Sequence, residues 1–129
     1  MVMSWRGTTA GETAALTGHD VVMSPMSHCY FDFNYKQIST ERVYFYEPIP
    51  ASLPVDKTHH VLGVQANFWS QNDHTPDRTD YQIYPRLLSL AERAWSPQDV
   101  RDWQDFHGRL NEHRSRLSAL GVKFNVEEK

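Results

Sequence analysis

Residues 61–69 read Val61-Leu-Gly-Val-Gln-Ala-Asn-Phe-Trp69, a run that is almost continuously apolar. A strand of this kind is buried on both faces, as in parallel sheets that are covered by helices. Two shorter segments, 2–5 and 21–24, come earlier in the chain and are also predicted to be buried strands. The pattern therefore favours an α/β fold that is built around a parallel sheet.

Helices are predicted between and after these strands. Residues 8–17 contain helix-favouring Ala and Glu, and apolar residues at three- and four-residue spacing predict helices over 79–95 and 98–120. Pro85 fits best in a first helical turn or at a kink. Residues 25–54 are aromatic and rich in proline, which predicts a loop rather than regular structure.

Strands that alternate with helices imply right-handed crossover units and a parallel sheet. Three strands make a small sheet for a chain of 129 residues. The alternative is that they form a consecutive arc of a larger barrel.

Composition excludes several classes of protein. The 13 Lys and Arg against 16 Asp and Glu give a net charge of −3, which argues against a nucleic-acid binder. No run approaches the roughly 20 apolar residues that cross a bilayer. The single cysteine, Cys29, excludes an internal disulfide and a zinc site built on several thiolates. The first residues lack the features of a signal peptide and do not indicate a compartment.

Several conspicuous residues have a structural interpretation. Trp95 and Trp103 lie on helical apolar stripes and are expected in the core, and Cys29 is expected to be a small buried filler. Arg86 and Glu92 are expected to form structural ion pairs. The histidines lack the spacing of a metal site, so we expect neither a metal nor a cofactor.

Functional side chains in α/β folds gather at the C-terminal ends of strands. The candidates here are Trp5, the segment 24–32 and the segment 69–71. Each group combines aromatic rings with hydrogen-bonding neighbours, a combination that suits the flat faces and hydroxyls of sugars.

Five motifs occur in order along residues 2–121. They are Trp5-Arg6, Val21-Val-Met-Ser-Pro25 leading to Cys29-Tyr-Phe-Asp32, Tyr44-Phe-Tyr-Glu-Pro-Ile-Pro50, Gly63-Val-Gln-Ala-Asn-Phe-Trp-Ser70 and Tyr84-Pro-Arg-Leu-Leu-Ser-Leu-Ala-Glu-Arg-Ala-Trp-Ser96. Together they resemble the family 20 glycoside hydrolases, the β-N-acetylhexosaminidases. The resemblance implies that 1–129 is a C-terminal segment of the catalytic domain, with the last three strands of a TIM-type (β/α) barrel, their helices and a C-terminal helix.

The resemblance also implies the reaction. It is the removal of terminal N-acetylglucosamine or N-acetylgalactosamine by substrate-assisted, retaining hydrolysis. The acetamido oxygen of the sugar attacks C1, so no enzyme carboxylate acts as nucleophile. The implied ligand is an N-acetylhexosamine-terminated glycan or a chitooligosaccharide, and the implied location is periplasmic, secreted or lysosomal.

Each candidate residue takes its role from this resemblance. Tyr30 resembles the tyrosine whose hydroxyl donates to the acetamido oxygen. Asp32 resembles the carboxylate that accepts from a hydroxyl near C6. Trp5 and Trp69 resemble walls of the sugar pocket. Gln71 falls where most members carry a glutamate, and an amide lacks the charge that makes such hydrogen bonds about twice as strong.

The larger departure is an absence. The family places an Asp and a general-acid Glu side by side, and no Asp-Glu dipeptide occurs in this sequence. The arginine that holds the C3 and C4 hydroxyls would lie before Met1. Loss of a general acid costs roughly 10²–10⁴-fold in rate, so we expect the chain alone to be inactive.

Two hypotheses about how the chain acts stay open. The chain either acts together with the remainder of a barrel, or it is a stand-alone sugar-binding or self-associating scaffold module derived from one. Three strands from an open barrel would leave two unpaired edges, which favours self-association.

Overall fold

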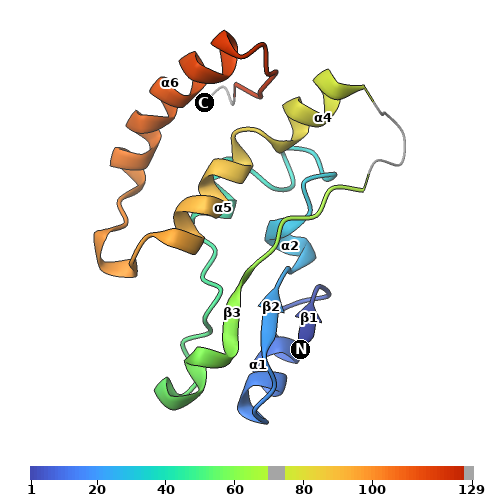
Figure 1. The fold of residues 1–129 in the computed structure, drawn as a ribbon, viewed down its shortest axis with the longest axis vertical. Helices are drawn as coiled ribbons and strands as arrows, with labels where there is room; N and C mark the ends of the chain where they lie inside the picture. Colours follow the sequence, from blue (N-terminus) through green and yellow to red (C-terminus); the bar gives the residue numbers. More distant parts are fainter. Residues whose placement is uncertain (70–74, 127–129) are drawn as a thin grey trace.

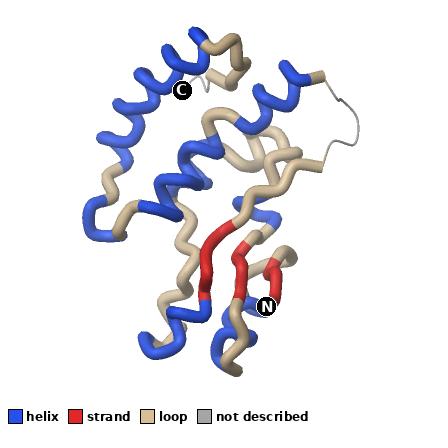
Figure 2. Tube along the Cα trace, viewed as in Figure 1, coloured by secondary structure: helices blue, strands red, loops and turns tan. Residues whose placement is uncertain are grey.

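Three short segments pair into a parallel sheet with the order β1-β2-β3 (Figures 1 and 2). β1 spans Val2–Ser4, β2 spans Val21–Met23 and β3 spans Val61–Val64. This computed structural model describes residues 1–69 and 75–126. The first two strands each end one residue before the predicted boundary.

The third strand is shorter than predicted. β3 ends at Val64, whereas the apolar run predicted a strand as far as Trp69. Beyond Val64 the described residues return to strand pairing at one isolated parallel bridge, between Asn67 and Tyr30. Beyond the end of the sheet, the chain after β3 therefore runs alongside the segment after β2, and the bridge places Asn67 next to Tyr30.

One face of the sheet is covered by α1 (Thr9–Leu16). Gly11 of this helix faces the buried side chains of Ser4 and Met23, and its N–H donates to Ser4 Oγ over 3.0 Å. Met3 alternates to the opposite face and stays about half exposed. The sheet is thus buried on the α1 side and open on the other.

The middle of the chain is more regular than predicted. Within the expected loop 25–54 lie two short helices, α2 (Met26–Cys29) and α3 (Thr40–Tyr44), and the 3₁₀ helix η1 (Val55–His60) follows. Ser39 explains the start of α3, because its hydroxyl accepts from the N–H of Arg42 over 3.0 Å.

Buried side chains from α2 and α3 join those of β2 in the main core. Its fully buried members include Met23, Cys29, Phe31, Ile38 and Val43. The aromatic, proline-rich stretch is therefore a packed part of the molecule.

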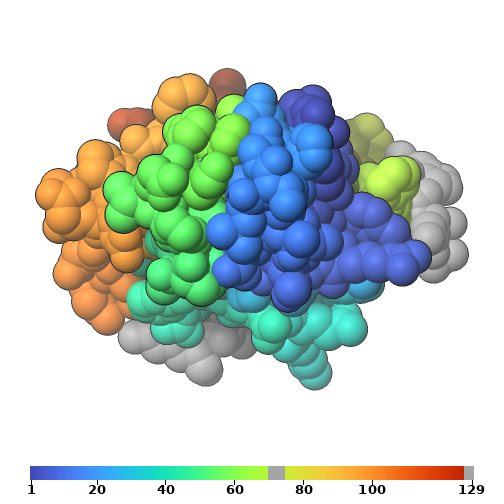
Figure 3. Space-filling model, turned by 90° about the horizontal axis from the view of Figure 1, so that it is seen from below, coloured from blue at the N-terminus to red at the C-terminus, as the bar shows by residue number. Residues whose placement is uncertain are grey.

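The end of the sheet where the strands begin is joined by polar contacts. Figure 3 views the molecule from this end, with residues near 55–60 in green beside residues near 10–20 in blue. His60 Nδ1 lies 3.0 Å from a carboxylate oxygen of Asp20, and Ser52 donates to Glu12. The hydrogen bond with His60 lowers the pKa of Asp20.

The predicted helix over 79–95 is two helices. α4 spans Pro76–Ile83 and α5 spans Arg86–Trp95, with a break at Tyr84 and Pro85. A proline inside a helix lacks the N–H that the ladder needs and clashes with the preceding turn, so the chain starts a new helix after it.

The expectation for Trp95 is wrong, because this side chain is 87% exposed. The buried face of α5 consists of Arg86, Ser89, Leu90 and Arg93. Arg86 and Arg93 point inward because their guanidinium groups donate hydrogen bonds to buried backbone carbonyls. Trp95, on another side of the helix, therefore faces outward.

The last predicted helix, 98–120, begins as a 3₁₀ turn, η2 (Gln98–Val100), and continues as α6 (Trp103–Ala119). α6 lies farthest from the sheet (Figure 1). It packs through Phe106 and Leu110 against Tyr44, with Trp103 partly buried beside them. Trp103, which was expected in the core, packs against this cluster but is only partly buried.

Candidate functional site

A pocket opens where the sheet ends, at the C-terminal ends of the strands. It has a volume of about 380 Å³ and is lined by Met3, Trp5, Tyr30, Asn67 and Trp69. Three of the five predicted site residues, Trp5, Tyr30 and Trp69, are therefore brought together. They follow three different strands and lie far apart in sequence.

The position of Tyr30 is set by its bridge to Asn67. The N–H of Asn67 donates to the carbonyl of Cys29 over 2.8 Å, and the N–H of Phe31 donates to the carbonyl of Asn67 over 2.8 Å. These bonds hold the backbone on both sides of Tyr30. The ring is half-buried and contacts Phe33 at a centroid distance of 6.3 Å.

Asn67 is a pocket residue that the sequence analysis missed. Its Nδ2 donates to Ser24 Oγ over 2.6 Å, and its Oδ1 accepts from Gln65 Nε2 over 2.8 Å. Ser24 Oγ in turn donates to the carbonyl of Gln65 over 2.8 Å. The signal was present in the sequence, since Gln65 and Asn67 are the polar residues that interrupt the apolar run.

The two tryptophans keep accessible ring surface at the pocket. Trp5 is 41% exposed and Trp69 is 58% exposed. The guanidinium carbon of Arg6 lies 4.9 Å from the Trp5 ring centroid, so a cation covers one face of that ring. Exposed aromatic faces of this kind can stack on apolar faces of a ligand.

Asp32 lies just beyond Tyr30 but does not line this pocket. Its Oδ1 is buried and, among the described residues, has no hydrogen-bond partner. Buried polar atoms are nearly always hydrogen-bonded, so this oxygen is an acceptor without its expected partner. Gln71 lies outside the described residues.

Cys29 takes no part in the pocket surface. The thiol is buried, and this burial raises its pKa to about 12. It therefore stays protonated at neutral pH, which agrees with the expected role as a small core residue.

Within residues 1–69 and 75–126, no group of three His, Cys, Asp or Glu side chains is placed to hold a metal ion. In the same part of the chain, no helix combines the length and the apolar character that a bilayer crossing requires.

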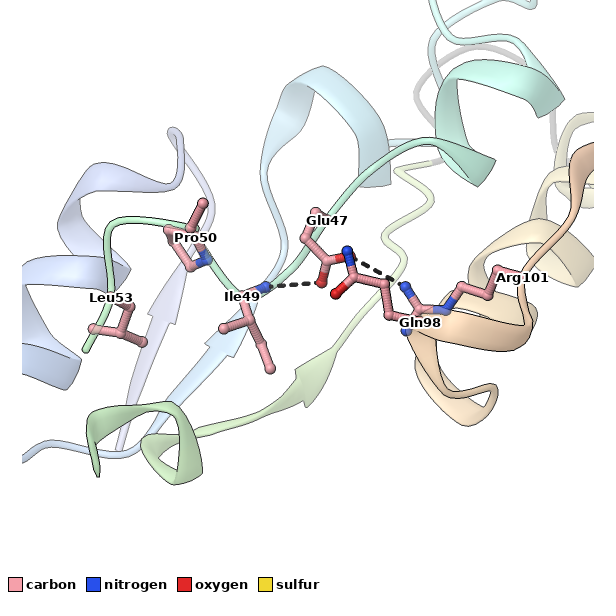
Figure 4. A pocket seen from close by; sticks show the side chains of 7 residues that line it. Glu47, Ile49, Pro50, Leu53, Gln98 and Arg101 are labelled. Carbon is pink, nitrogen blue, oxygen red and sulfur yellow. Dashed lines mark hydrogen bonds and ion pairs between the residues drawn. The ribbon is translucent and has the colours of Figure 1, made fainter. Parts of the chain in front are cut away.

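A second cavity of about 400 Å³ lies away from the predicted residues, and Figure 4 shows its lining. Glu47 points across it toward Arg101, at 3.1 Å, and also accepts from Arg93 of α5. The carboxylate is thereby shared between two arginines, which fastens the 47–53 loop to the C-terminal helices. We assign this cavity to the packing between these elements.

Comparison with known proteins gives a consistent result. Residues 1–98 match the family described as "Glycosyl hydrolase family 20, catalytic domain". A β-hexosaminidase of Porphyromonas gingivalis is 41% identical over 97% of this chain, and a β-N-acetylhexosaminidase of Cellulomonas fimi is 30% identical over 88% of it. The chain spans only 18% and 25% of the length of these two relatives.

Solved structures agree. A family 20 exo-β-N-acetylglucosaminidase of Vibrio harveyi, in complex with N-acetylglucosamine, has a TM-score of 0.88 and 31% identity over 99% of this chain. The β-N-acetylhexosaminidase of Streptomyces coelicolor A3(2) has a TM-score of 0.87 and 26% identity over the whole chain. The chain covers 22% and 30% of these two proteins. The expected α/β class, an arc of a TIM-type barrel, is confirmed.

Motifs, fold and comparisons thus agree along most of the chain, and the matched residues include Trp5, Tyr30 and Trp69. The chain belongs to glycosyl hydrolase family 20.

Proposed function

We propose that this chain supplies one side of the sugar pocket of a β-N-acetylhexosaminidase. The observation that carries the proposal is the convergence of Trp5, Tyr30 and Trp69, from three strand ends, on one pocket. The implied ligand is a glycan or chitooligosaccharide that ends in N-acetylglucosamine or N-acetylgalactosamine.

The proposed reaction is substrate-assisted hydrolysis with retention. The acetamido oxygen of the sugar attacks C1, and the glycosidic bond to the leaving group breaks. A water molecule then attacks C1 and breaks the bond to the acetamido oxygen, so that the configuration at C1 is retained. Tyr30 donates its hydroxyl proton in a hydrogen bond to that oxygen and holds it in the attacking geometry. The tryptophans stack on the sugar and acetamido group, and the Asp32 carboxylate accepts from a hydroxyl near C6.

The leaving group needs a general acid, and the family's adjacent Asp-Glu pair has no counterpart in these 129 residues. We propose that the pocket is completed by further protein and that the 129-residue chain alone is inactive. The open face of the sheet around Met3 supports this view, because a barrel interior is filled by side chains from all of its strands.

The test is Tyr30→Phe in the gene product that carries this chain. Removing one hydrogen-bond donor from a developing charge costs about 10²–10³-fold in turnover. We expect kcat on an aryl N-acetyl-β-glucosaminide to fall by about that factor, with the thermal unfolding midpoint unchanged.

Tyr46→Phe is the matched control. The Tyr46 hydroxyl is buried and, within the described residues, makes no hydrogen bond, so its removal should leave kcat unchanged. Wild-type kinetics in Tyr30→Phe would overturn the assigned role.

The exposed tryptophans also support a second candidate function, a stand-alone sugar-binding module. It predicts that the chain alone binds N-acetylglucosamine at millimolar or lower concentration, with a change in tryptophan fluorescence. A flat titration counts against it.

A further inference from the structure

Arg86 of α5 is fully buried, and its guanidinium group lies among backbone carbonyls of residues 31–38. A buried cation of this kind is costly unless hydrogen bonds satisfy it. The rings of Phe31 and Tyr35 contribute as well, with centroids 4.9 Å and 4.1 Å from the guanidinium carbon. Arg86 therefore connects α5 to the segment that follows Tyr30.

The carbonyls that Arg86 holds flank Asp32. Its Nη2 donates to the carbonyl of Phe31 over 2.6 Å, and its Nη1 donates to the carbonyl of Phe33 over 2.8 Å. Nη1 also reaches the carbonyl of Ile38 over 3.1 Å. The planar guanidinium thus fixes the peptide groups on both sides of one residue, a geometry that a lysine ammonium cannot reproduce.

The carbonyl between them is held too. Gln82 Nε2 donates to the carbonyl of Asp32 over 3.4 Å, and the carbonyl of Gln82 itself accepts from Nε of Arg86 over 3.0 Å. Three consecutive carbonyls, of residues 31, 32 and 33, therefore accept from two side chains that start four residues apart at the α4–α5 junction.

We infer that Arg86 and Gln82 are positioning residues for the Asp32 carboxylate. With its backbone held at three successive peptide groups, Asp32 has its Cα–Cβ bond fixed in direction, which sets where the carboxylate can lie. Its Oδ1 is left buried and, among the described residues, without a hydrogen-bond partner.

The consequence is selectivity for one hydroxyl. This step rests on the proposed function, in which Asp32 accepts from a sugar hydroxyl near C6. A site built to hydrogen-bond a hydroxyl discriminates strongly against an analogue that lacks it. Arg86 therefore affects, through Asp32, the preference for a substrate with this hydroxyl over one without it. It takes no direct part in the reaction at C1.

The experiment compares an aryl N-acetyl-β-glucosaminide with its 6-deoxy analogue, using the gene product that carries this chain. We expect the wild type to prefer the hydroxylated substrate by about 10- to 100-fold in kcat/KM, the range of a hydrogen bond to a charged group. Asp32→Asn and Arg86→Lys should each reduce this preference to within about threefold.

Arg93→Lys is the matched control. Arg93 is also buried on α5 and also donates to a loop carbonyl, that of Tyr46 over 2.7 Å, but it lies outside the pocket. It should keep the wild-type preference. If Arg86→Lys does not fold, Gln82→Met is tested in its place. We expect this variant to reduce the preference for the hydroxylated substrate by about threefold, and an unchanged preference would overturn the inference.

Two results overturn the inference alone. In the first, Arg86→Lys keeps the wild-type preference although Asp32→Asn loses it. In the second, Arg86→Lys loses kcat/KM equally on both substrates, as a merely structural role predicts. If Asp32→Asn keeps the wild-type preference, the Asp32 carboxylate does not set that preference, and the inference that Arg86 acts through it is overturned as well. A wild type that hydrolyses neither substrate overturns the proposed function and, with it, this step.

Discussion

Three polar side chains of α2, of α3 and of the residues just after α3 are buried. Cys29, Tyr44 and Tyr46 are each less than 5% exposed, and burial raises the pKa of all three. In the described residues the two tyrosine hydroxyls have no hydrogen-bond partner. These groups are therefore neutral packing residues, whereas Tyr30 lines the pocket.

At this scale the raised pKa of Cys29 gives a direct test. A thiol with a pKa of about 12 carries about 10³-fold less thiolate at pH 8 than an ordinary cysteine, and the thiolate is the nucleophile. We expect iodoacetamide to leave Cys29 unmodified in the native protein and to alkylate it in denaturant, measured by peptide mass spectrometry. Rapid native alkylation would contradict the burial.

At the scale of the elements, α1 packs very closely against the sheet at Gly11. A Cβ built on Gly11 would meet Met23 Sδ at 2.7 Å and Ser4 Cβ at 2.9 Å. Both neighbours belong to buried residues and have little room to move. We expect Gly11→Ala to lower the free energy of unfolding by about 1–3 kcal/mol, the usual cost of overpacking, as measured by urea denaturation.

Gly108→Ala is the matched change in α6. A Cβ at Gly108 meets no described atom within 4 Å, and alanine favours a helix over glycine by about 1 kcal/mol. This variant should be slightly more stable than the wild type. Equal effects of the two substitutions would contradict the assigned packing of α1.

Periodicity predicted the order of the elements better than their boundaries. The 61–69 run is apolar except at Gln65 and Asn67, which predicted a single strand. From Gln65 onward, however, the chain follows the segment after β2, and the apolar pattern does not indicate where the strand ends. The predicted apolar stripe over 79–95 was wrong for Trp95, because Arg86 and Arg93 are buried through hydrogen bonds to distant carbonyls and Trp95 is exposed.

The candidate site shows the same division. Trp5, Tyr30 and Trp69 were identifiable from motifs and from their positions after strands, and the structure places them in one pocket. Asn67 and Arg86 were not identified as site residues, because their roles arise from contacts across 37 to 55 residues of chain. Contacts of this range are fixed by tertiary packing and leave no local pattern.

The whole molecule presents an open sheet. Within the described residues β1 and β3 each pair only with β2, so each has a free edge. Met3 of β1 is 47% exposed and Leu62 of β3 is 58% exposed. Unpaired parallel strands with apolar side chains are templates for pairing with another chain. Further barrel strands would cover these edges in a complete enzyme, and a second copy can do so when the chain is alone.

We therefore expect the 129-residue chain, expressed alone, to elute ahead of a 15.0 kDa monomer and to show no hydrolysis of an aryl N-acetyl-β-glucosaminide. A charge at an exposed strand edge opposes such pairing, so Leu62→Lys should shift the chain toward the monomer in sedimentation velocity. Leu120→Lys, at an exposed leucine just after α6, should leave the assembly unchanged. A compact monomer of the unmodified chain would show that the open edges are protected in some other way, and the sugar-binding module would then become the better description of the isolated chain.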